Sequence, residues 1–297
     1  MLAIIIPYYK IIFFEETLKS LANQTDKRFK VYIGNDASLE NPSLLLENYK
    51  RQINIEHHQF ENNLGSISLV RQWERCIALI DNEEWIMILG DDDVLGENVV
   101  EYFYRNINFI NVESSNVVRY ATYKIDGTGT RISNIYQHPV KESAVDVLFR
   151  KTRSSLSEYI FKKEKVNKIK FKDFPLGWFS DILAVFEFSD FKNIFSINDA
   201  VLYIRISSES ISGSSSYEVL KATASFKFYH YLLSNYSLRF SKSQIKILQN
   251  NIQKCYLNNK RVFSFLIGIT KLYLKKSWIK SYCNFLIAIL NFFFKKQ

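Results

Sequence analysis

Three consecutive carboxylates are the strongest sign of chemistry in the sequence. Asp91, Asp92 and Asp93 directly follow the apolar run 85–89, which is typical of a strand buried on both faces. Neighbouring carboxylates raise one another's pKa unless a cation neutralises them. Their oxygens suit a hard divalent ion, Mg²⁺ or Mn²⁺, which could in turn hold a diphosphate. An acidic turn that caps a helix expected over 97–108 explains the same residues about equally well.

A second acid, Asp36, follows the strand expected over 29–33. In open α/β sheets, ligands bind outside the carboxyl ends of the strands, where a carboxylate can accept a hydrogen bond from a base or a ribose. An Asx turn or a helix N-cap is the competing interpretation of Asp36, and for an isolated residue it is the favoured one.

Alternating strand and helix signals would bring these acids to one edge of a sheet. In the first half of the chain we expect strands over 2–6, 29–33, 53–57 and 85–89, and helices over 14–22, 42–47 and 66–80. Such alternation predicts a mostly parallel sheet built from right-handed crossovers. Further along, the patterns predict strands over 116–125, 159–162 and 200–206, and helices over 142–150 and 180–188.

Taken together, these segments resemble the family 2 inverting glycosyltransferases of the GT-A fold. The order and spacing of five motifs carry the resemblance, namely Ile6–Lys10, Leu18–Thr25, Asn35–Ser38, Glu61–Gly65 with Arg71 beyond it, and Leu89–Asp93. Two weaker matches follow at Gly177–Asp181 and Tyr203–Ser212. The resemblance implies an α/β fold, with a Rossmann-like, mostly parallel sheet flanked by helices over residues 1–216. A helical, basic C-terminal extension over 217–297 would follow this catalytic domain.

The resemblance also implies a reaction and its residues. A sugar would pass from a nucleotide-diphospho-sugar, a UDP-sugar by family habit, to a hydroxyl of a glycan or lipid-linked glycan in surface polysaccharide synthesis. Asp181 would be the general base, and Asp92 and Asp93 would bind Mn²⁺ or Mg²⁺, so the enzyme would depend on metal. The nucleotide site would contain Pro7, Tyr9, Asp36, Asn63, Gly65, Arg71 and Asp91. For Asp181 the alternative is an acid that favours a helix N-terminus, and for Arg71 a solvated helix residue.

Four positions depart from the family motifs: Asn35, Gly90, Ser180 and Ser207 stand where acids or a histidine are usual. They motivate an alternative function, a catalytically inactive nucleotide-sugar-binding or scaffold protein with the same fold. A sugar-phosphate nucleotidyltransferase is disfavoured, because no glycine-rich loop with Arg and Lys follows the first strand.

Composition excludes several classes of protein. The chain has 297 residues, of which 47% are hydrophobic, and only 9 Gly and 4 Pro, so it is globular and not collagen-like or a linker. Cys76, Cys255 and Cys283 are too scattered for a disulfide scaffold or a zinc framework, which favours a reducing, cytoplasmic compartment. The first residues lack the basic region of a signal peptide, and no run of about 20 uncharged apolar residues predicts a membrane span.

Charge divides the chain sharply. Residues 219–297 contain 14 Lys and Arg and no Asp or Glu, whereas the remainder carries 25 basic and 30 acidic residues. Helices expected over 219–235, 241–257, 261–274 and 278–294 combine this charge with apolar residues, which favours a peripheral contact with an anionic membrane surface. A helical packing subdomain and a protein–protein interface are the alternatives. No recognised nucleic-acid-binding module is present, so we expect no nucleic-acid partner.

Overall fold

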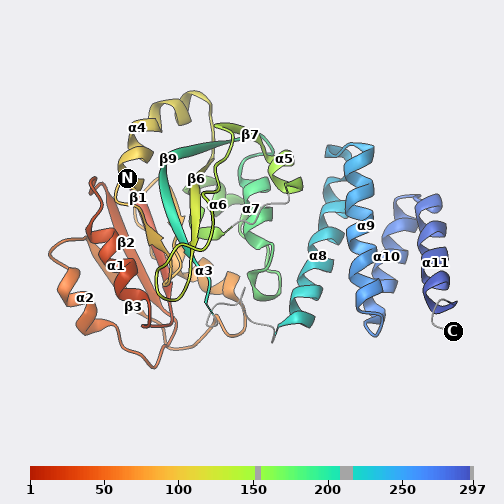
Figure 1. Cartoon of the computed structure of the whole chain (residues 1–297), viewed down its shortest axis with the longest axis horizontal. Coiled ribbons are helices and arrows are strands. Elements are labelled where there is room, and N and C mark those ends of the chain that lie inside the picture. The colour runs from red at the N-terminus through yellow and green to blue at the C-terminus, as the bar shows by residue number, and fades with distance from the viewer. Residues whose placement is uncertain (151–154, 208–216, 295–297) are drawn as a thin grey trace. The chain divides into compact units, whose positions relative to one another are not determined.

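The computed structural model describes residues 1–150, 155–207 and 217–294 (Figure 1). The chain divides into two compact units. The first unit comprises Met1–Asp173 and Ser180–Ser215, and the second comprises Phe174–Phe179 and Ser216–Gln297. The boundary near residue 216 lies where the charge and the helical pattern of the sequence change, but the short segment Phe174–Phe179 joins the second unit from within the first.

The elements of the first unit alternate along the chain over most of its length. Its strands are β1 (Leu2–Tyr8), β2 (Phe29–Asn35), β3 (Ile55–Gln59), β4 (Trp85–Ile88), β5 (Val94–Leu95), β6 (Val117–Ile125), β7 (Lys141–Ser143), β8 (Tyr159–Lys162) and β9 (Asn193–Arg205). Its α-helices are α1 (Phe14–Ala22), α2 (Ser43–Tyr49), α3 (Leu69–Ile77), α4 (Val99–Val112), α5 (Ala144–Phe149), α6 (Lys163–Ile169) and α7 (Ser180–Phe188), and a 3₁₀ turn, η1, covers Leu156–Glu158.

These strands form one sheet in the order β3-β2-β1-β4-β8-β6-β9-β5, with β7 paired to β9. Pairing is parallel throughout β3-β2-β1-β4 and between β6 and β9, whereas β8 runs antiparallel between β4 and β6. The predicted α/β class is therefore confirmed. Because β1, β2 and β4 are parallel neighbours, the loops that follow them meet at one edge of the sheet.

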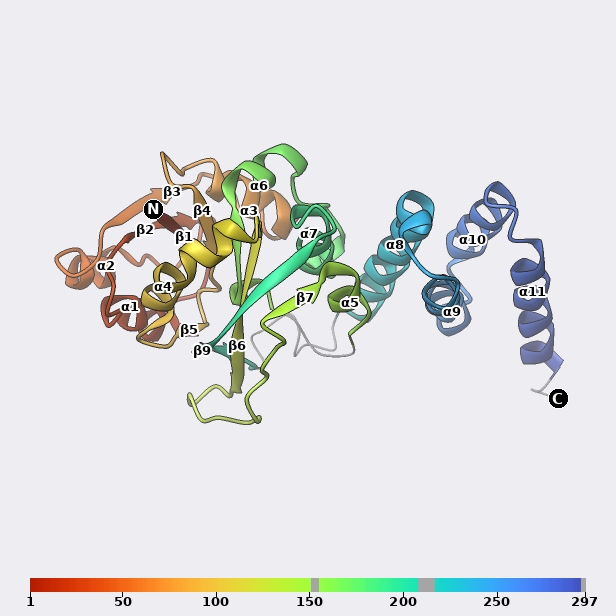
Figure 2. The same ribbon diagram turned by 90° about the horizontal axis from the view of Figure 1, so that it is seen from above.

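Helices cover both faces of this sheet, with α1 and α4 on one side and α3 and α6 on the other (Figure 2). Alternate residues of β1, including Ile4 and Tyr8, pack into a core with Leu18 of α1 and Phe103 of α4. The opposite face is rich in aromatic residues. There the rings of Phe161 and Phe188 lie 5.4 Å apart, edge to face, which is a favoured arrangement of buried aromatic pairs.

The second unit is helical. It contains the 3₁₀ turns η2 (Pro175–Gly177) and η3 (Ser237–Arg239) and the helices α8 (Glu218–Tyr236), α9 (Lys242–Asn258), α10 (Phe263–Lys275) and α11 (Ile279–Phe294). A capping box of Ser241 and Gln244 begins α9, as its sequence favours. Within this unit Phe179 stacks on Phe228 of α8, with ring centroids 4.5 Å apart. Within the described ranges, no helix is long and apolar enough to cross a bilayer.

Candidate active site

The acidic loop after β4 is tied to the segment that follows β1. The Oδ2 atom of Asp91 accepts hydrogen bonds from the backbone N–H groups of Tyr9 and Lys10, at 2.8 and 2.9 Å. The Thr17 hydroxyl donates to the carbonyl of Asp93 at 2.8 Å and contacts that of Asp91 at 3.2 Å. The first aspartate therefore fixes two neighbouring loops against each other at the carboxyl edge of the sheet.

Asp93 joins this loop to two further elements. Its Oδ2 accepts from the Ser157 hydroxyl at 2.5 Å, and its Oδ1 accepts from the backbone N–H of Arg205 at 2.9 Å. The same Ser157 hydroxyl accepts from the backbone N–H of Gly90 at 3.0 Å. Both oxygens of Asp93 are thus already hydrogen-bonded, and Ser157 of η1 bridges the two ends of the acidic loop.

Arg205 brings a buried positive charge to the acidic loop. Its Nε donates to the Asp92 carbonyl at 2.9 Å and its Nη1 to the Asp126 carbonyl at 2.8 Å. Its Nη2 forms an ion pair with Glu16, and the guanidinium lies 4.3 Å from the ring centroid of Phe13. Sequence analysis assigned this arginine no role beyond its place in a family motif.

Asp92 carries a charge that a bound cation would compensate. Burial, together with the charges of Asp93 and Asp91, raises the pKa of Asp92 to about 8, against an opposing effect from Arg205. Burial also raises the pKa of Asp91, although its two backbone hydrogen bonds oppose the change. A bound divalent ion would relieve this accumulation of negative charge.

The residues present fit a metal held jointly with a substrate. Across the described ranges, no group of three or more His, Cys, Asp or Glu side chains could hold a metal ion. Mg²⁺-type ions commonly take only one or two carboxylates and complete their shell with substrate phosphates and water. Asp92 can supply one such carboxylate, and Asp93 could add a ligand only by sharing an oxygen that already accepts a hydrogen bond.

Gly90 leaves no room for a side chain beside the carboxylates that follow it. A Cβ atom at this position would lie 2.9 Å from Oδ1 of Asp92 and 3.1 Å from Oδ2 of Asp93. A side chain here would therefore displace the two carboxylates predicted to bind metal. The absence of an acid at position 90 is consistent with the way the loop is folded.

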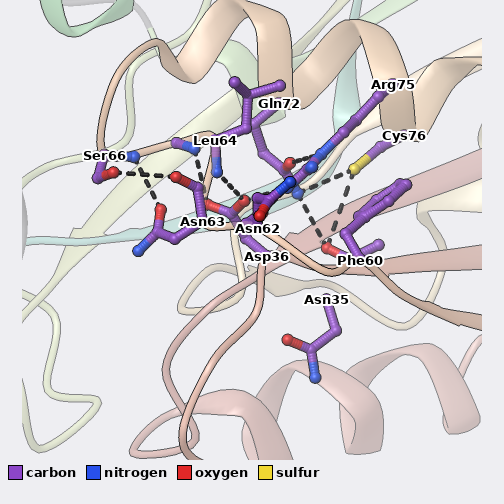
Figure 3. A network of polar contacts seen from close by, with 12 residues as sticks. Asn35, Asp36, Phe60, Asn62, Asn63, Leu64, Ser66, Gln72, Arg75 and Cys76 are labelled. Carbon is purple, nitrogen blue, oxygen red and sulfur yellow. Dashed lines mark hydrogen bonds and ion pairs between the residues drawn. The ribbon is translucent and has the colours of Figure 1, made fainter.

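Asp36 organises a second loop, 62–65 (Figure 3). Its carboxylate accepts from the backbone N–H groups of Leu64 at 2.7 Å and Gly65 at 2.8 Å and forms an ion pair with Arg75. A Cβ atom at Gly65 would lie 2.5 Å from Oδ2 of Asp36, so glycine allows this close approach. The backbone N–H of Asp36 donates to the Tyr8 carbonyl at 3.0 Å, which places Asp36 beside the end of β1.

Arg75, and not Arg71, is the arginine of α3 that reaches this site. Arg75 donates to the Asn62 carbonyl at 2.8 Å, and its guanidinium lies 3.9 Å from the ring centroid of Phe60. Arg71 lies one turn earlier, where its backbone N–H bonds the N-cap Ser68 and its side chain is exposed. The i, i+4 spacing of the two arginines was the signal in the sequence that could have suggested Arg75.

The other nucleotide-site residues predicted from the sequence lie on the same edge. Pro7 is half-buried near the end of β1, and Tyr9 is exposed just beyond it. Asn63 shapes its own loop, since its Oδ1 accepts from the backbone N–H of Ser66 at 2.8 Å. Asn35 acts similarly, because its Oδ1 accepts from the backbone N–H of Ser38 at 2.9 Å.

Asp181 lies in the first turn of α7, close enough to Glu158 of η1 for its charge to matter. Burial, with a smaller contribution from the charge of Asp181, raises the pKa of Glu158 to about 8, although Arg119 opposes this shift. Ser180, where the family has a glutamate, is buried and donates to the Lys172 carbonyl at 2.7 Å. A buried glutamate thus does accompany Asp181, but it comes from another element.

A short chain of contacts connects the acids at this edge. Ser157 bonds Asp93, and the next residue, Glu158, lies near Asp181. Asp36 bonds Tyr8, the last residue of β1, and Asp91 bonds Tyr9, the residue after it. The part of the last family motif over 208–212 lies outside the described residues.

Comparison with known proteins decides the family. A model described as glycosyl transferase family 2 matches residues 3–194, which is more than half of the chain. The chain belongs to this family. The resemblance inferred from its motifs, including the GT-A fold, is thereby confirmed. No curated protein matches the chain significantly.

Solved structures of glycosyltransferases share the fold. S. aureus TarS 1–349 in complex with UDP-GlcNAc has a TM-score of 0.59 and 17% identity, over 92% of this chain and 72% of that one. The mannosyltransferase PcManGT from Pyrobaculum calidifontis, in complex with GDP-Man and Mn²⁺, has a TM-score of 0.55 and 10% identity. That match covers 97% of this chain and 79% of the mannosyltransferase. At such identities the likeness concerns the fold alone.

Proposed function

We propose that this glycosyltransferase moves a sugar, with inversion, from a UDP-sugar to an acceptor hydroxyl. The observation that carries the proposal is the chain of contacts that links the Asp36 loop, the Asp91–Asp93 loop and Asp181 at one edge of the sheet. This is the edge at which open α/β sheets bind their ligands.

The donor would occupy the carboxyl ends of β1, β2 and β4. Pro7 and Tyr9 would line the base pocket, and Asp36 would act on the nucleotide together with the loop that it holds, which includes Asn63 and Gly65. Arg75 would contribute positive charge near the diphosphate, whereas the family resemblance placed Arg71 near the nucleotide. The UDP-GlcNAc complex of the similar TarS fold supports a uridine donor.

A divalent ion, Mn²⁺ or Mg²⁺, would be held by Asp92, with Asp93 as a second ligand and Asp91 beside them. When bound, such an ion offsets the negative charge that develops on the leaving diphosphate. Asp91 would contribute by keeping the loop after β1 in place through its two backbone hydrogen bonds. Arg205 would hold the acidic loop through its bonds to the Asp92 carbonyl and the Asp93 carboxylate.

Asp181 would act as the general base that takes the proton from the acceptor hydroxyl as it attacks the anomeric carbon. A single displacement of this kind inverts the anomeric configuration, because the hydroxyl attacks opposite to the leaving diphosphate. Glu158, which holds its own proton up to a pH of about 8, would add no negative charge beside Asp181 near neutral pH.

The acceptor would be a glycan or lipid-linked glycan in surface polysaccharide synthesis, met by the enzyme at an anionic membrane surface. The charge of residues 219–297 supports this setting, since these residues carry 14 basic and no acidic side chains. The departures at Asn35, Gly90 and Ser207 support the alternative of an inactive binding or scaffold protein.

Donor turnover in the presence of Mn²⁺ tests both candidates. We expect hydrolysis or transfer of a UDP-sugar, and a loss of about 10²–10⁴-fold in kcat for Asp181→Asn with nucleotide affinity retained. Asp173→Asn changes an exposed aspartate just before η2; it is the matched control and should keep its activity. Full activity of Asp181→Asn would show that the base is misassigned. Nucleotide binding without turnover across a panel of donors would establish the scaffold alternative.

A further inference from the structure

Helix α11 is apolar on two opposite sides. Its inner side packs within the second unit, where the Ser281 hydroxyl donates to Oε1 of Gln249 at 3.1 Å and the rings of Phe285 and Tyr256 lie 5.9 Å apart. Its outer side carries exposed apolar residues at helical spacing, which we call the outer stripe: Ile279, Cys283, Leu286, Ile287 and Leu290.

The outer stripe is not a set of scattered surface residues. Ile287 and Leu290 are 53% and 55% exposed, although such side chains are mostly buried in water-soluble domains. The neighbouring helix α10, which packs against α11, also exposes Phe263, Ile267 and Leu274 along one side. Exposed apolar residues aligned along one side of a helix are typical of an interaction site.

The positive charge around the outer stripe favours an anionic partner. Lys271 and Lys275 of α10 and Lys280 of α11 are exposed, and no acidic residue occurs after Glu218. A second copy of this chain would bring one basic surface against another, which like-charge repulsion opposes. An anionic lipid surface instead complements both the lysines and the apolar side chains.

We propose that the outer stripe of α11 inserts shallowly into the headgroup region of an anionic lipid bilayer, with the helix lying parallel to the membrane plane. At 16 residues, α11 is about 24 Å long, shorter than the roughly 30 Å hydrocarbon core that a spanning helix must cross. The inference rests on the membrane contact proposed above, but not on the catalytic assignments.

Cys283 provides a direct probe, because it lies within the stripe and is exposed, whereas Cys76 is buried. In a Cys255→Ser background of the full chain, a polarity-sensitive fluorophore on Cys283 should shift to the blue with vesicles of mixed phosphatidylglycerol and phosphatidylcholine. Phosphatidylcholine alone should give little shift. The matched control carries the label at Leu44→Cys, an exposed site in α2, with Cys283→Ser, and should not respond.

A second variant tests the apolar contribution. Ile287→Gln together with Leu290→Gln should lower partitioning onto the mixed vesicles by about tenfold or more, because two inserted side chains become polar. Leu44→Gln should leave the partitioning unchanged. Transfer to a water-soluble acceptor, measured in parallel, should not change in either variant, so a failure of the membrane proposal is distinguishable from a failure of the catalytic one.

Any of three vesicle results would overturn the proposal: no binding to vesicles, equal binding to phosphatidylcholine alone, or an equal loss of binding in the Leu44→Gln control. Oligomers in light scattering that dissociate in the Ile287→Gln, Leu290→Gln variant would also overturn it, since they would assign the stripe to a second copy of the chain.

Discussion

At the scale of single residues, Ser157 has an unusual position. One hydroxyl accepts from the Gly90 N–H and donates to Asp93, so it fixes both the start and the end of the acidic loop. Its hydroxyl touches neither base nor sugar in the arrangement proposed above. Ser157 is therefore a positioning residue, whose effect reaches the reaction through the carboxylates that it orients.

We expect Ser157→Ala to lower kcat by roughly 10–100-fold and to cost about 1–2 kcal/mol of stability, because a buried carboxylate oxygen and a buried N–H lose their partner. Steady-state kinetics and thermal unfolding check this. Ser225→Ala, which removes a hydroxyl that bonds the Lys221 carbonyl on α8, should leave kcat unchanged. Equal kinetic losses in both variants would argue against a positioning role.

Glu158 gives the stability of the protein a dependence on pH. Its pKa is near 4.5 in the unfolded chain and about 8 in the folded one, so between these values the folded state holds a proton that the unfolded state has released. Stability should therefore fall as pH rises from about 5 to 8, by an amount on the order of 3–4 kcal/mol from this group.

The variant Glu158→Gln should reduce that slope. Glutamine keeps the acceptor for the Ser155 N–H that closes the capping box, but it has no proton to lose. Urea unfolding at pH 5 and pH 9 compares the two proteins, and the variant should gain on the wild type at the higher pH. An identical loss of stability in both would mean that another group titrates.

At the scale of elements, α3 presents two arginines one turn apart, and only Arg75 turns toward the Asp36 loop. We expect Arg75→Ala to weaken nucleotide binding by about tenfold or more, since Asp36 and the loop at 62–65 lose a charged partner. Arg71→Ala should change affinity less than twofold. Calorimetric titration with UDP measures the affinity of both variants. A larger loss of affinity in Arg71→Ala than in Arg75→Ala would favour Arg71, the arginine of the family motif.

Regular elements were largely predictable, and contacts between them were not. The strictly apolar run of β4 and the helical spacing of α1 gave correct elements, because each buries a continuous face. The strands β5 and β7 are only two and three residues long, and the helix α6 is rich in lysine. None of the three has enough regularly spaced apolar residues to be predicted from the sequence.

The same division holds within the site. The acids Asp36 and Asp91 were predictable because each directly follows an apolar strand. Glu158 and Arg205 were not, because their roles depend on tertiary packing that brings η1 and β9 beside the acidic loop. No local spacing in the sequence records such contacts.

At the scale of the whole molecule, ligand binding should raise thermal stability by mass action. With UDP at about 100 times its Kd in the presence of Mn²⁺, the stabilisation should be about 2.7 kcal/mol. Asp92→Asn should lose the part of this gain that depends on Mn²⁺ while keeping the part that UDP gives with a chelator. Thermal unfolding of the wild type and of the variant, each with UDP plus Mn²⁺ and with UDP plus a chelator, checks this. An undiminished Mn²⁺ effect in the variant would show that Asp92 does not bind the metal.

Division of the chain into units has a practical consequence for shortened versions of this enzyme. The segment 174–179 belongs with the C-terminal helices, where Phe179 has a left-handed φ of 68° and stacks on Phe228, and Asp181 follows only two residues later. A protein cut after residue 216 would leave Phe174 and Phe179 without their aromatic neighbours and would release the backbone immediately ahead of the assigned base. Removal of the basic helices would therefore also affect the segment next to Asp181. A loss of activity on truncation would not by itself show that membrane binding is needed.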